Sequence, residues 1–147
     1  MVQKDCLRNI LIIFSDYYPE VTKNLLNGAK KILEKKKILH QTIKVDGTLE
    51  IPFVLQKYKN KYSGFVILGC VIKGETDHYD IIKNVAIKYI YDLSYKELLP
   101  MSCAILTVEN YSQALERSKN NKKNLGERSA QVCLNLIDLL YEKESKS

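Results

Sequence analysis

The chain has 147 residues and a mass of 17.0 kDa, a size that suits one domain with its own core, so we expect a single domain over residues 1–147. Hydrophobic residues make up 46% and charged residues 27% of the sequence. This composition excludes a disordered chain, a collagen and a disulfide scaffold. The formal net charge is +6, which can indicate an anionic partner.

Hydropathy and cysteine spacing limit the class further. The longest apolar runs, such as Ile10–Phe14 and Phe65–Leu68, fall far short of the ~18 residues that a membrane span needs. Met1–Arg8 shows no apolar stretch before a cleavage site, so we expect a cytoplasmic protein without a membrane partner. The cysteines form no Cys-x-x-Cys pair, which favours small buried hydrophobes over a metal or redox site; they are Cys6, Cys70, Cys103 and Cys133.

The first half of the chain predicts two strands, each followed by a helix. Ile10–Phe14 is continuously apolar, which is typical of a strand buried on both faces. Apolar residues then recur at helical spacing over Val21–Leu33, and Pro19 suits the first turn of that helix. Next come a strand at Leu39–Val45, a turn signal at Asp46-Gly47, and a helix over Ile51–Tyr62 opened by Pro52.

The second half continues the alternation. A fully apolar strand, Phe65–Leu68, is expected to end at Gly69, and a helical stripe follows over Ile81–Leu93. The remaining elements are a strand over Met101–Thr107 after Pro100, a helix over Tyr111–Lys119, a polar loop over Asn120–Asn124 and a helix over Glu127–Tyr141. Alternating buried strands and helices predict a mainly parallel sheet covered on both faces. Ligands of such sheets bind beyond the carboxyl ends of the strands.

The most informative of these strand ends is the segment Gly69–His78. We expect a helix to begin near Thr76 and Asp77, where free backbone N–H groups and a close approach at Gly74 would suit a phosphate. His78 would then lie beside a bound anion. The sequence also allows a capped helix with a merely exposed histidine, or a metal site from Glu75, Asp77, His78 and Asp80. Neither a P-loop nor a dinucleotide fingerprint is present.

Three further residues stand out near strand ends or among the basic residues. Glu50 could cap the helix that follows it or accept hydrogen bonds from ligand hydroxyls. Arg117 is one of three arginines in a lysine-rich chain, and its planar fork suits a phosphate, unless it merely pairs with Glu116 on the surface. Tyr17 could stack on a flat ring, although exposed tyrosines are common. His40, at a strand start, is expected to be structural.

Lysines cluster at Lys35–Lys37 and between Lys119 and Lys123. They suit the solvated ends of helices. RNA binding is the alternative, and a steep salt dependence of oligonucleotide binding would support it. No ribonucleoprotein motif, zinc finger or basic zipper is present in the sequence, so we expect no nucleic-acid partner.

Three segments in order resemble the lumazine synthase family of riboflavin biosynthesis. The resemblance extends from about residue 10 to about residue 140. The segments are Val45-Asp46-Gly47-Thr48-Leu49-Glu50-Ile51-Pro52, Leu68-Gly69-Cys70-Val71-Ile72-Lys73-Gly74-Glu75-Thr76-Asp77-His78-Tyr79, and Leu106-Thr107-Val108-Glu109-Asn110 with Gln113-Ala114-Leu115-Glu116-Arg117.

The resemblance implies an α/β fold, a flavodoxin-like three-layer sandwich with a four-stranded parallel sheet. It implies a homopentamer, alone or within a sixty-subunit shell, with sites between neighbouring subunits. The implied substrates are 5-amino-6-(D-ribitylamino)uracil and 3,4-dihydroxy-2-butanone 4-phosphate, condensed without a cofactor or metal. The implied residues are His78 for proton transfer, Tyr17, Thr48, Leu49, Glu50, Cys70, Val71 and Ile72 for the pyrimidinedione and its ribityl chain, and Glu75, Thr76 and Arg117 for the phosphate.

The chain departs from the family pattern at two places. Cys103 stands where the family often has an aromatic residue from the neighbouring subunit beside the ring, so it is included among the substrate-binding residues. Leu125 stands where the family has a lysine within Asn-Lys-Gly, which could shift that charge to Lys122 or Lys123. Two other classes remain open: a flavin- or pterin-binding module without catalysis, and a purely structural shell protein.

Overall fold

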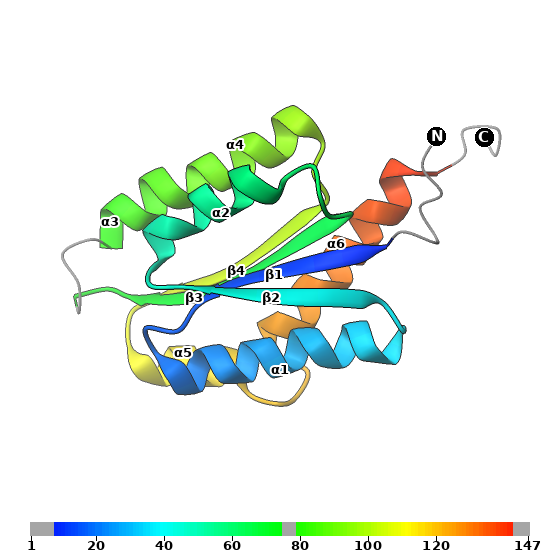
Figure 1. Ribbon diagram of the computed structural model, residues 1–147. Helices are drawn as coiled ribbons and strands as arrows, with labels where there is room; N and C mark the ends of the chain where they lie inside the picture. The colour runs from blue at the N-terminus through cyan, green and yellow to red at the C-terminus, as the bar shows by residue number, and fades with distance from the viewer. Residues whose placement is uncertain (1–7, 75–78, 143–147) are drawn as a thin grey trace.

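The computed structural model describes residues 8–74 and 79–142, shown in Figure 1. Strands and helices alternate as the sequence predicts. The strands are β1 (Asn9–Ser15), β2 (Leu39–Val45), β3 (Gly64–Ile72) and β4 (Met101–Val108). The helices are α1 (Pro19–Lys35), η1 (Thr48–Glu50), α2 (Ile51–Tyr58), α3 (Tyr79–Ile81), the π-helical turn η2 (Ile82–Ala86), α4 (Ile87–Glu97), α5 (Tyr111–Ser118) and α6 (Leu125–Leu140).

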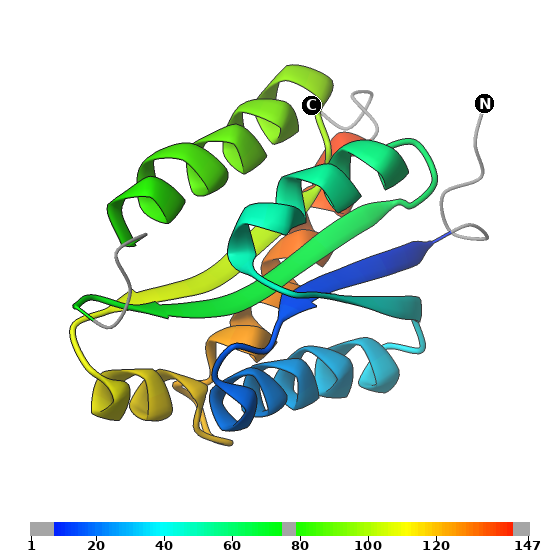
Figure 2. The same ribbon diagram turned by 60° about the vertical axis from the view of Figure 1, so that its left-hand side comes forward.

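The four strands form one parallel sheet in the order β2-β1-β3-β4. Helices α1, α5 and α6 cover one face, and α2, α3 and α4 cover the other (Figures 1 and 2). The expected α/β three-layer sandwich with a four-stranded parallel sheet is therefore confirmed. Across the residues that the structure describes, no helix is both long and apolar enough to cross a membrane.

Strand β3 shows why the sheet is buried on both faces. All nine of its residues are buried. Because side chains alternate along a strand, Val66, Leu68 and Cys70 join the core under α1 and α6. Phe65 and Ile67 join the core under α2 and α4. The sequence therefore reads as a continuous apolar run rather than as an alternating one, as expected for an inner parallel strand.

Helices α1 and α6 approach each other closely. A Cβ added at Gly126 would lie 2.0 Å from the backbone oxygen of Leu25, so only glycine fits there. Asn124 caps α6 by accepting a hydrogen bond from the Glu127 N–H at 2.9 Å. Its Nδ2 also donates to the carbonyl oxygens of Asn24 and Ser118 at 3.1 and 3.0 Å. The asparagine and glycine around Leu125 thus join three helices of this layer.

The opposite layer is joined less completely. The Tyr89 hydroxyl on α4 donates to Gln56 Oε1 on α2 at 2.9 Å. Beside this contact Phe53 is 76% exposed and Val85 is 59% exposed. An apolar cleft of about 510 Å³ lies between the two helices. This face of the sheet therefore carries apolar surface that the described part of the chain does not cover.

Three predicted boundaries are wrong. Strand β3 does not end at Gly69 but continues to Ile72, and the left-handed turn comes at Gly74, with a φ of 86°. Helix α2 ends at Tyr58, not Tyr62, because the chain turns there to enter β3, with the Lys61 N–H donating to the Tyr58 carbonyl. Helix α6 begins two residues early, at Leu125, because Asn124 caps it.

The cysteine prediction is confirmed for Cys70 and Cys133, which are buried. Cys103 is free and only partly buried. Cys6 lies outside the described residues. Burial raises the pKa of the Cys133 thiol to about 12 and that of the Cys103 thiol to about 11. Both thiols are therefore protonated at neutral pH.

Candidate active site

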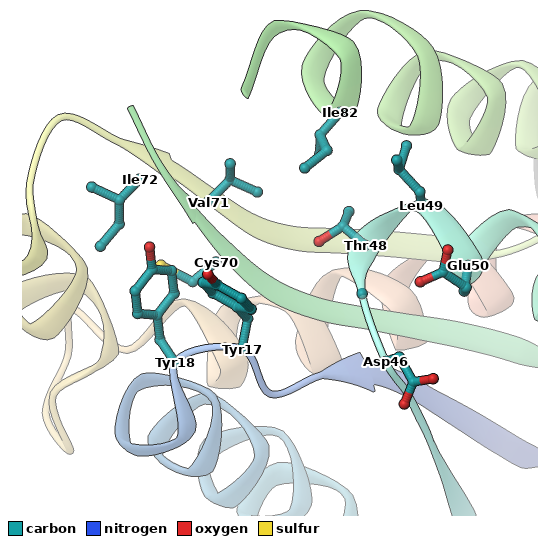
Figure 3. A pocket seen from close by; sticks show the side chains of 11 residues that line it. Tyr17, Tyr18, Asp46, Thr48, Leu49, Glu50, Cys70, Val71, Ile72 and Ile82 are labelled. Atoms are coloured by element: carbon teal, nitrogen blue, oxygen red, sulfur yellow. The ribbon is translucent and has the colours of Figure 1, made fainter. Parts of the chain in front are cut away.

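A cavity of about 380 Å³ opens at the carboxyl ends of β1, β2 and β3, where a parallel sheet is expected to bind its ligands (Figure 3). It is mostly apolar, with polar groups concentrated on one side. Its lining residues are Tyr17, Tyr18, Asp46, Gly47, Thr48, Leu49, Glu50, Cys70, Val71, Ile72 and Ile82. Seven of the substrate-binding residues predicted from the sequence are therefore brought together in one place.

The loop after β1 places two tyrosines at the cavity. Its base is fixed, because the Thr22 hydroxyl on α1 donates to the Ser15 carbonyl oxygen at 2.9 Å. Tyr17 leaves this loop with 69% of its surface exposed. In Figure 3 its ring stands beside Cys70, at the end of β3. A flat ligand entering the cavity would meet this exposed ring.

The loop after β2 supplies the polar side. Thr48 is buried, and its hydroxyl lies 3.5 Å from the Ser15 hydroxyl. Gly69 makes room for this contact, since a Cβ there would lie 3.0 Å from the Ser15 hydroxyl oxygen. A hydroxyl at the end of β1 and one from η1 thus meet over a glycine in β3. This close approach accounts for a glycine at this position inside the strand.

Glu50 stands at the N-terminus of α2, but its side chain accepts no capping hydrogen bond. Instead it lines the cavity, with Oε1 at 3.0 Å from the position of a Cβ at Gly47. The sequence left two roles open for Glu50, a helix cap or an acceptor for ligand hydroxyls, and the capping role is not the one that the structure shows. The carboxylate is exposed and able to accept hydrogen bonds from ligand hydroxyls.

The end of β3 forms the apolar floor. Cys70, Val71 and Ile72 are 1–4% exposed and pair with β4 through to Val108. They enter the cavity as strand residues, which makes their backbone rigid. Ile82, from the π-helical turn, closes the far side. Such turns often occur at functional sites.

The sequence analysis did not assign four of the lining residues to the site. Asp46 and Gly47 were interpreted as a turn and as part of a segment that carries the family resemblance, and Ile82 only as part of a helical stripe. Tyr18 lies in the loop after the first strand but was assigned no role. The position of Asp46 after a strand was the available signal for that residue, whereas the spacing of an apolar stripe does not distinguish Ile82 from a core residue.

Two other predicted residues do not line this cavity. Cys103 lies on the edge strand β4, where it pairs with Ile67, and it packs on the face covered by α2 and α4. Arg117 is exposed in the last turn of α5. Its suggested partner Glu116 instead pairs with Lys119 and Lys123, each at 2.8 Å. These lysines lower the pKa of the Glu116 carboxyl to about 2.

The remaining predicted residues, Glu75, Thr76 and His78, lie outside the described residues. So does Asp77, and of the alternative metal set only Asp80 is described. Within residues 8–74 and 79–142, no group of three His, Cys, Asp or Glu side chains could hold a metal ion. The other histidine, His40, has Nδ1 3.0 Å from the Ile38 carbonyl oxygen.

The cavity geometry suits a ligand with two chemically different ends. An exposed aromatic ring and an apolar strand end can hold a flat heterocycle. A carboxylate and a buried hydroxyl on the opposite side can bind a polyol chain. The described part of the cavity contains no cationic side chain, so a phosphate group would need residues from elsewhere.

Comparison with known proteins identifies the family. The model of the 6,7-dimethyl-8-ribityllumazine synthase family matches residues 8–141. The chain is 40% identical over 134 residues to the 6,7-dimethyl-8-ribityllumazine synthase of Bartonella tribocorum, with 89% of each chain covered. It is 38% identical to the enzyme of that name from Agrobacterium fabrum, covering 89% of this chain and 93% of the relative.

A third relative, the 6,7-dimethyl-8-ribityllumazine synthase of Paramagnetospirillum magneticum, is 36% identical over 145 residues, covering 92% of this chain and 97% of the relative. The match thus extends over nearly the full length of both chains. The fold, the position of the cavity and these similarities agree. The chain belongs to the lumazine synthase family, transferases of riboflavin biosynthesis.

Proposed function

We propose that this chain condenses 5-amino-6-(D-ribitylamino)uracil with 3,4-dihydroxy-2-butanone 4-phosphate to form 6,7-dimethyl-8-ribityllumazine. The observation that carries the proposal is the cavity at the carboxyl ends of β1 to β3, which gathers seven residues that the family resemblance assigns to the first substrate. The cavity volume of about 380 Å³ is within the range of small-molecule sites.

Each side of the cavity receives one part of that substrate. The pyrimidinedione ring stacks on Tyr17 and lies along Cys70, Val71 and Ile72. The ribityl chain extends toward Thr48–Glu50, where the Glu50 carboxylate accepts hydrogen bonds from its hydroxyls. Hydrogen bonds to a charged group contribute ~1.5–3 kcal/mol each. Glu50→Gln is therefore expected to raise KM for this substrate by about ten- to a hundredfold.

The proposed reaction begins when the ring amine attacks the ketone carbon and water leaves, which gives an imine. Inorganic phosphate is then eliminated, and the second amine attacks the new carbonyl and closes the ring with loss of a second water. His78 transfers protons in these steps, and Glu75, Thr76 and Arg117 bind the phosphate. Orientation in a closed site can account for ~7–11 kcal/mol of the barrier, and proton transfer adds ~10²–10⁴-fold.

The active form in this proposal is a homo-oligomer, a pentamer alone or within a sixty-subunit shell. The apolar cleft between α2 and α4 supports this, because Phe53 and Val85 form exposed apolar surface there, and such patches mark sites of protein–protein interaction. The cleft shares Leu49 with the candidate site. A neighbouring chain seated on it would border the cavity directly.

We also propose that Arg117 and Cys103 serve the site of a neighbouring chain. Neither lines the cavity of its own chain, which lacks a described cation for the phosphate. A shared site of this kind has a consequence that can be tested. Defects in residues from the two sides should complement each other in mixed oligomers, whereas two defects on one side should not.

The test is lumazine formation, measured by absorbance, after two variants are produced in the same cell and purified as mixed assemblies. Glu50→Gln and Arg117→Ala should each lower the activity at least tenfold. Their mixture should recover activity, because some sites combine an intact cavity with an intact arginine. A mixture of Glu50→Gln and Tyr17→Leu is the control and should remain low.

Recovery confined to the Glu50→Gln and Arg117→Ala mixture would establish the shared site. If neither mixture recovers, Arg117 acts within its own chain. If the wild type is no faster than a protein-free control, the synthase proposal itself is wrong. His78→Ala, assayed alone, should retain part of the activity, and an unchanged turnover would remove His78 from the chemistry.

Compartment and domain extent complete the proposal. We infer a cytoplasmic enzyme, because no disulfide joins the described cysteines, as is usual in reducing compartments. We infer one lumazine synthase-like domain over residues 1–147, since a single sheet organises all the described elements. Fractionation and limited proteolysis would test these two points.

A further inference from the structure

We propose that Tyr18 is a positioning residue, which holds the ring of Tyr17 in the orientation that stacks on the pyrimidinedione. The inference rests on the proposed function, because it concerns the same cavity. It assigns a role to a residue that the sequence analysis did not consider. Three observations support it: the anchoring of Tyr18, its contact with Tyr17, and its support by Tyr111.

Tyr18 is anchored at both its backbone and its ring. Its carbonyl oxygen accepts a hydrogen bond from the Thr22 N–H at 3.0 Å, in the first turn of α1. Pro19 follows and fixes the start of that helix. The ring of Tyr18 is partly buried and packs against the core under α1 and α6. Tyr17, by contrast, is 69% exposed.

The two rings meet edge to face. Their centroids lie 5.0 Å apart, with an angle of 81° between the ring planes. This geometry is one that aromatic pairs prefer. Figure 3 shows both rings side by side at the entrance of the cavity. Since Tyr17 has little contact with the core of its own, its orientation depends on the anchored neighbour.

Tyr111 supports Tyr18 from the other side. Its ring centroid lies 6.1 Å from that of Tyr18. Tyr111 is the first residue of α5, whose N-terminus is fixed by the Asn110 side chain, which accepts from the Gln113 N–H at 2.9 Å. The three rings therefore form a row from α5 to the cavity, and the outermost ring, Tyr17, faces the ligand.

A fixed ring binds better than a mobile one, because less conformational freedom is lost on binding. Removing the Tyr18 ring should therefore raise KM for the ribitylaminouracil substrate by about two- to tenfold, the range that aromatic pair energies correspond to. The KM for the butanone phosphate should stay within about twofold. Tyr18→Phe keeps the ring and should rescue the wild-type value.

The decisive experiment is a double-mutant cycle on KM for the ribitylaminouracil substrate, with wild type, Tyr17→Leu, Tyr18→Leu and the double variant. If Tyr18 acts through Tyr17, Tyr18→Leu will have no further effect once Tyr17 is leucine. Tyr111→Leu should shift KM in the same direction by less. It also gives a test should Tyr18→Leu not fold.

Additive effects in the cycle would overturn the proposal, as would a Tyr18→Phe variant that behaves like Tyr18→Leu. A second readout separates this proposal from the synthase proposal. In protein labelled with 3-fluorotyrosine, the Tyr17 fluorine resonance is assigned by its loss in Tyr17→Phe. It should move toward the free amino-acid position in Tyr18→Leu and stay in Tyr18→Phe. An unchanged resonance in Tyr18→Leu would show that Tyr18 does not hold the ring of Tyr17, whether or not the protein is an enzyme.

Discussion

The two helical layers on the sheet differ in how closely their helices pack. On one face, α1 and α6 meet so closely that a side chain at Gly126 would collide with the backbone of Leu25. On the other, α2 and α4 stand apart over a cleft and leave Phe53 exposed. The closed layer is complete within one chain, whereas the open layer is suited to a partner. A substitution in the closed layer should therefore lower the free energy of unfolding. A substitution on the exposed surface of the open layer should instead weaken assembly.

The largest effect is expected in the closed layer, from Gly126→Ala. The new methyl group would lie 2.0 Å from the Leu25 carbonyl oxygen, and backbone on both sides cannot yield. We expect a loss of about 3 kcal/mol in the free energy of unfolding, measured by urea denaturation. Arg128→Ala, on the exposed side of α6, is the control. Equal stability of the two variants would show that the layer is not closed by this contact.

Asn124→Ala should have the next largest effect. The variant loses the α6 cap and leaves the carbonyl oxygens of Asn24 and Ser118 without this donor. A loss of about 2 kcal/mol is expected in the same measurement. Asn110→Ala removes the exposed cap of α5, one hydrogen bond only, and should cost less. A larger loss at Asn110 would contradict the assigned role of Asn124.

At the far end of α1, Lys37→Gly should stabilise the chain. Lys37 has a φ of 58°, and the next residue, Ile38, donates back to the Leu33 carbonyl at 2.8 Å, the arrangement in which glycine is preferred. Glycine relieves the strain of the positive φ, but it also increases the conformational entropy of the unfolded chain. The net gain expected in the free energy of unfolding is about 0.5–1 kcal/mol. Lys36→Gly, at ordinary φ, should instead be destabilising, and a gain there would refute the reasoning.

The smallest effect on stability is expected in the open layer, from Phe53→Ser. Because the side chain is 76% exposed, the free energy of unfolding of the single chain should change by less than about 0.5 kcal/mol. The mass of the assembly, measured by sedimentation, should nevertheless fall, because the apolar cleft loses its largest exposed side chain. Leu55→Ala, a buried position on the same helix that serves as the control, should lower the free energy of unfolding by about 2 kcal/mol. If the mass is unchanged in Phe53→Ser, the cleft is not the assembly surface.

Most of the fold could be predicted from local pattern. Continuous apolar runs identified the inner strands, and Pro19 and Pro52 marked helix starts as the structure has them. Boundaries failed where a distant contact decides them. Gly69 was interpreted as the end of a strand, but it lies inside β3 because residues 69–72 continue to pair with β4, and the Ser15 hydroxyl occupies the space beside it. No local signal contains that information.

The prediction of the candidate site likewise included some of the lining residues and was incomplete for others. The loops after β1 and β2 were predicted because loops at the carboxyl ends of parallel strands converge, whereas Thr48 and Leu49 within them were assigned only through the family resemblance. Ile82 was missed, since its helical spacing is the same for a core residue and for a residue that lines a cavity. Tyr18 was missed because its role depends on ring contacts with Tyr17 and Tyr111. Spacing in a sequence identifies which loops meet, but not which side chains support one another.

The described chain ends have a practical consequence. Arg8, just before β1, pairs with Asp138 near the end of α6 at 2.5 Å, so both ends lie at the amino edge of the sheet, opposite the cavity (Figure 1). Affinity tags or fused cargo that follow on from residue 8 or residue 142 would start on the side of the sheet away from the cavity. The contact between Arg8 and Asp138 also brings the first strand and the last helix together. A circularly permuted enzyme could therefore be engineered around an intact pocket.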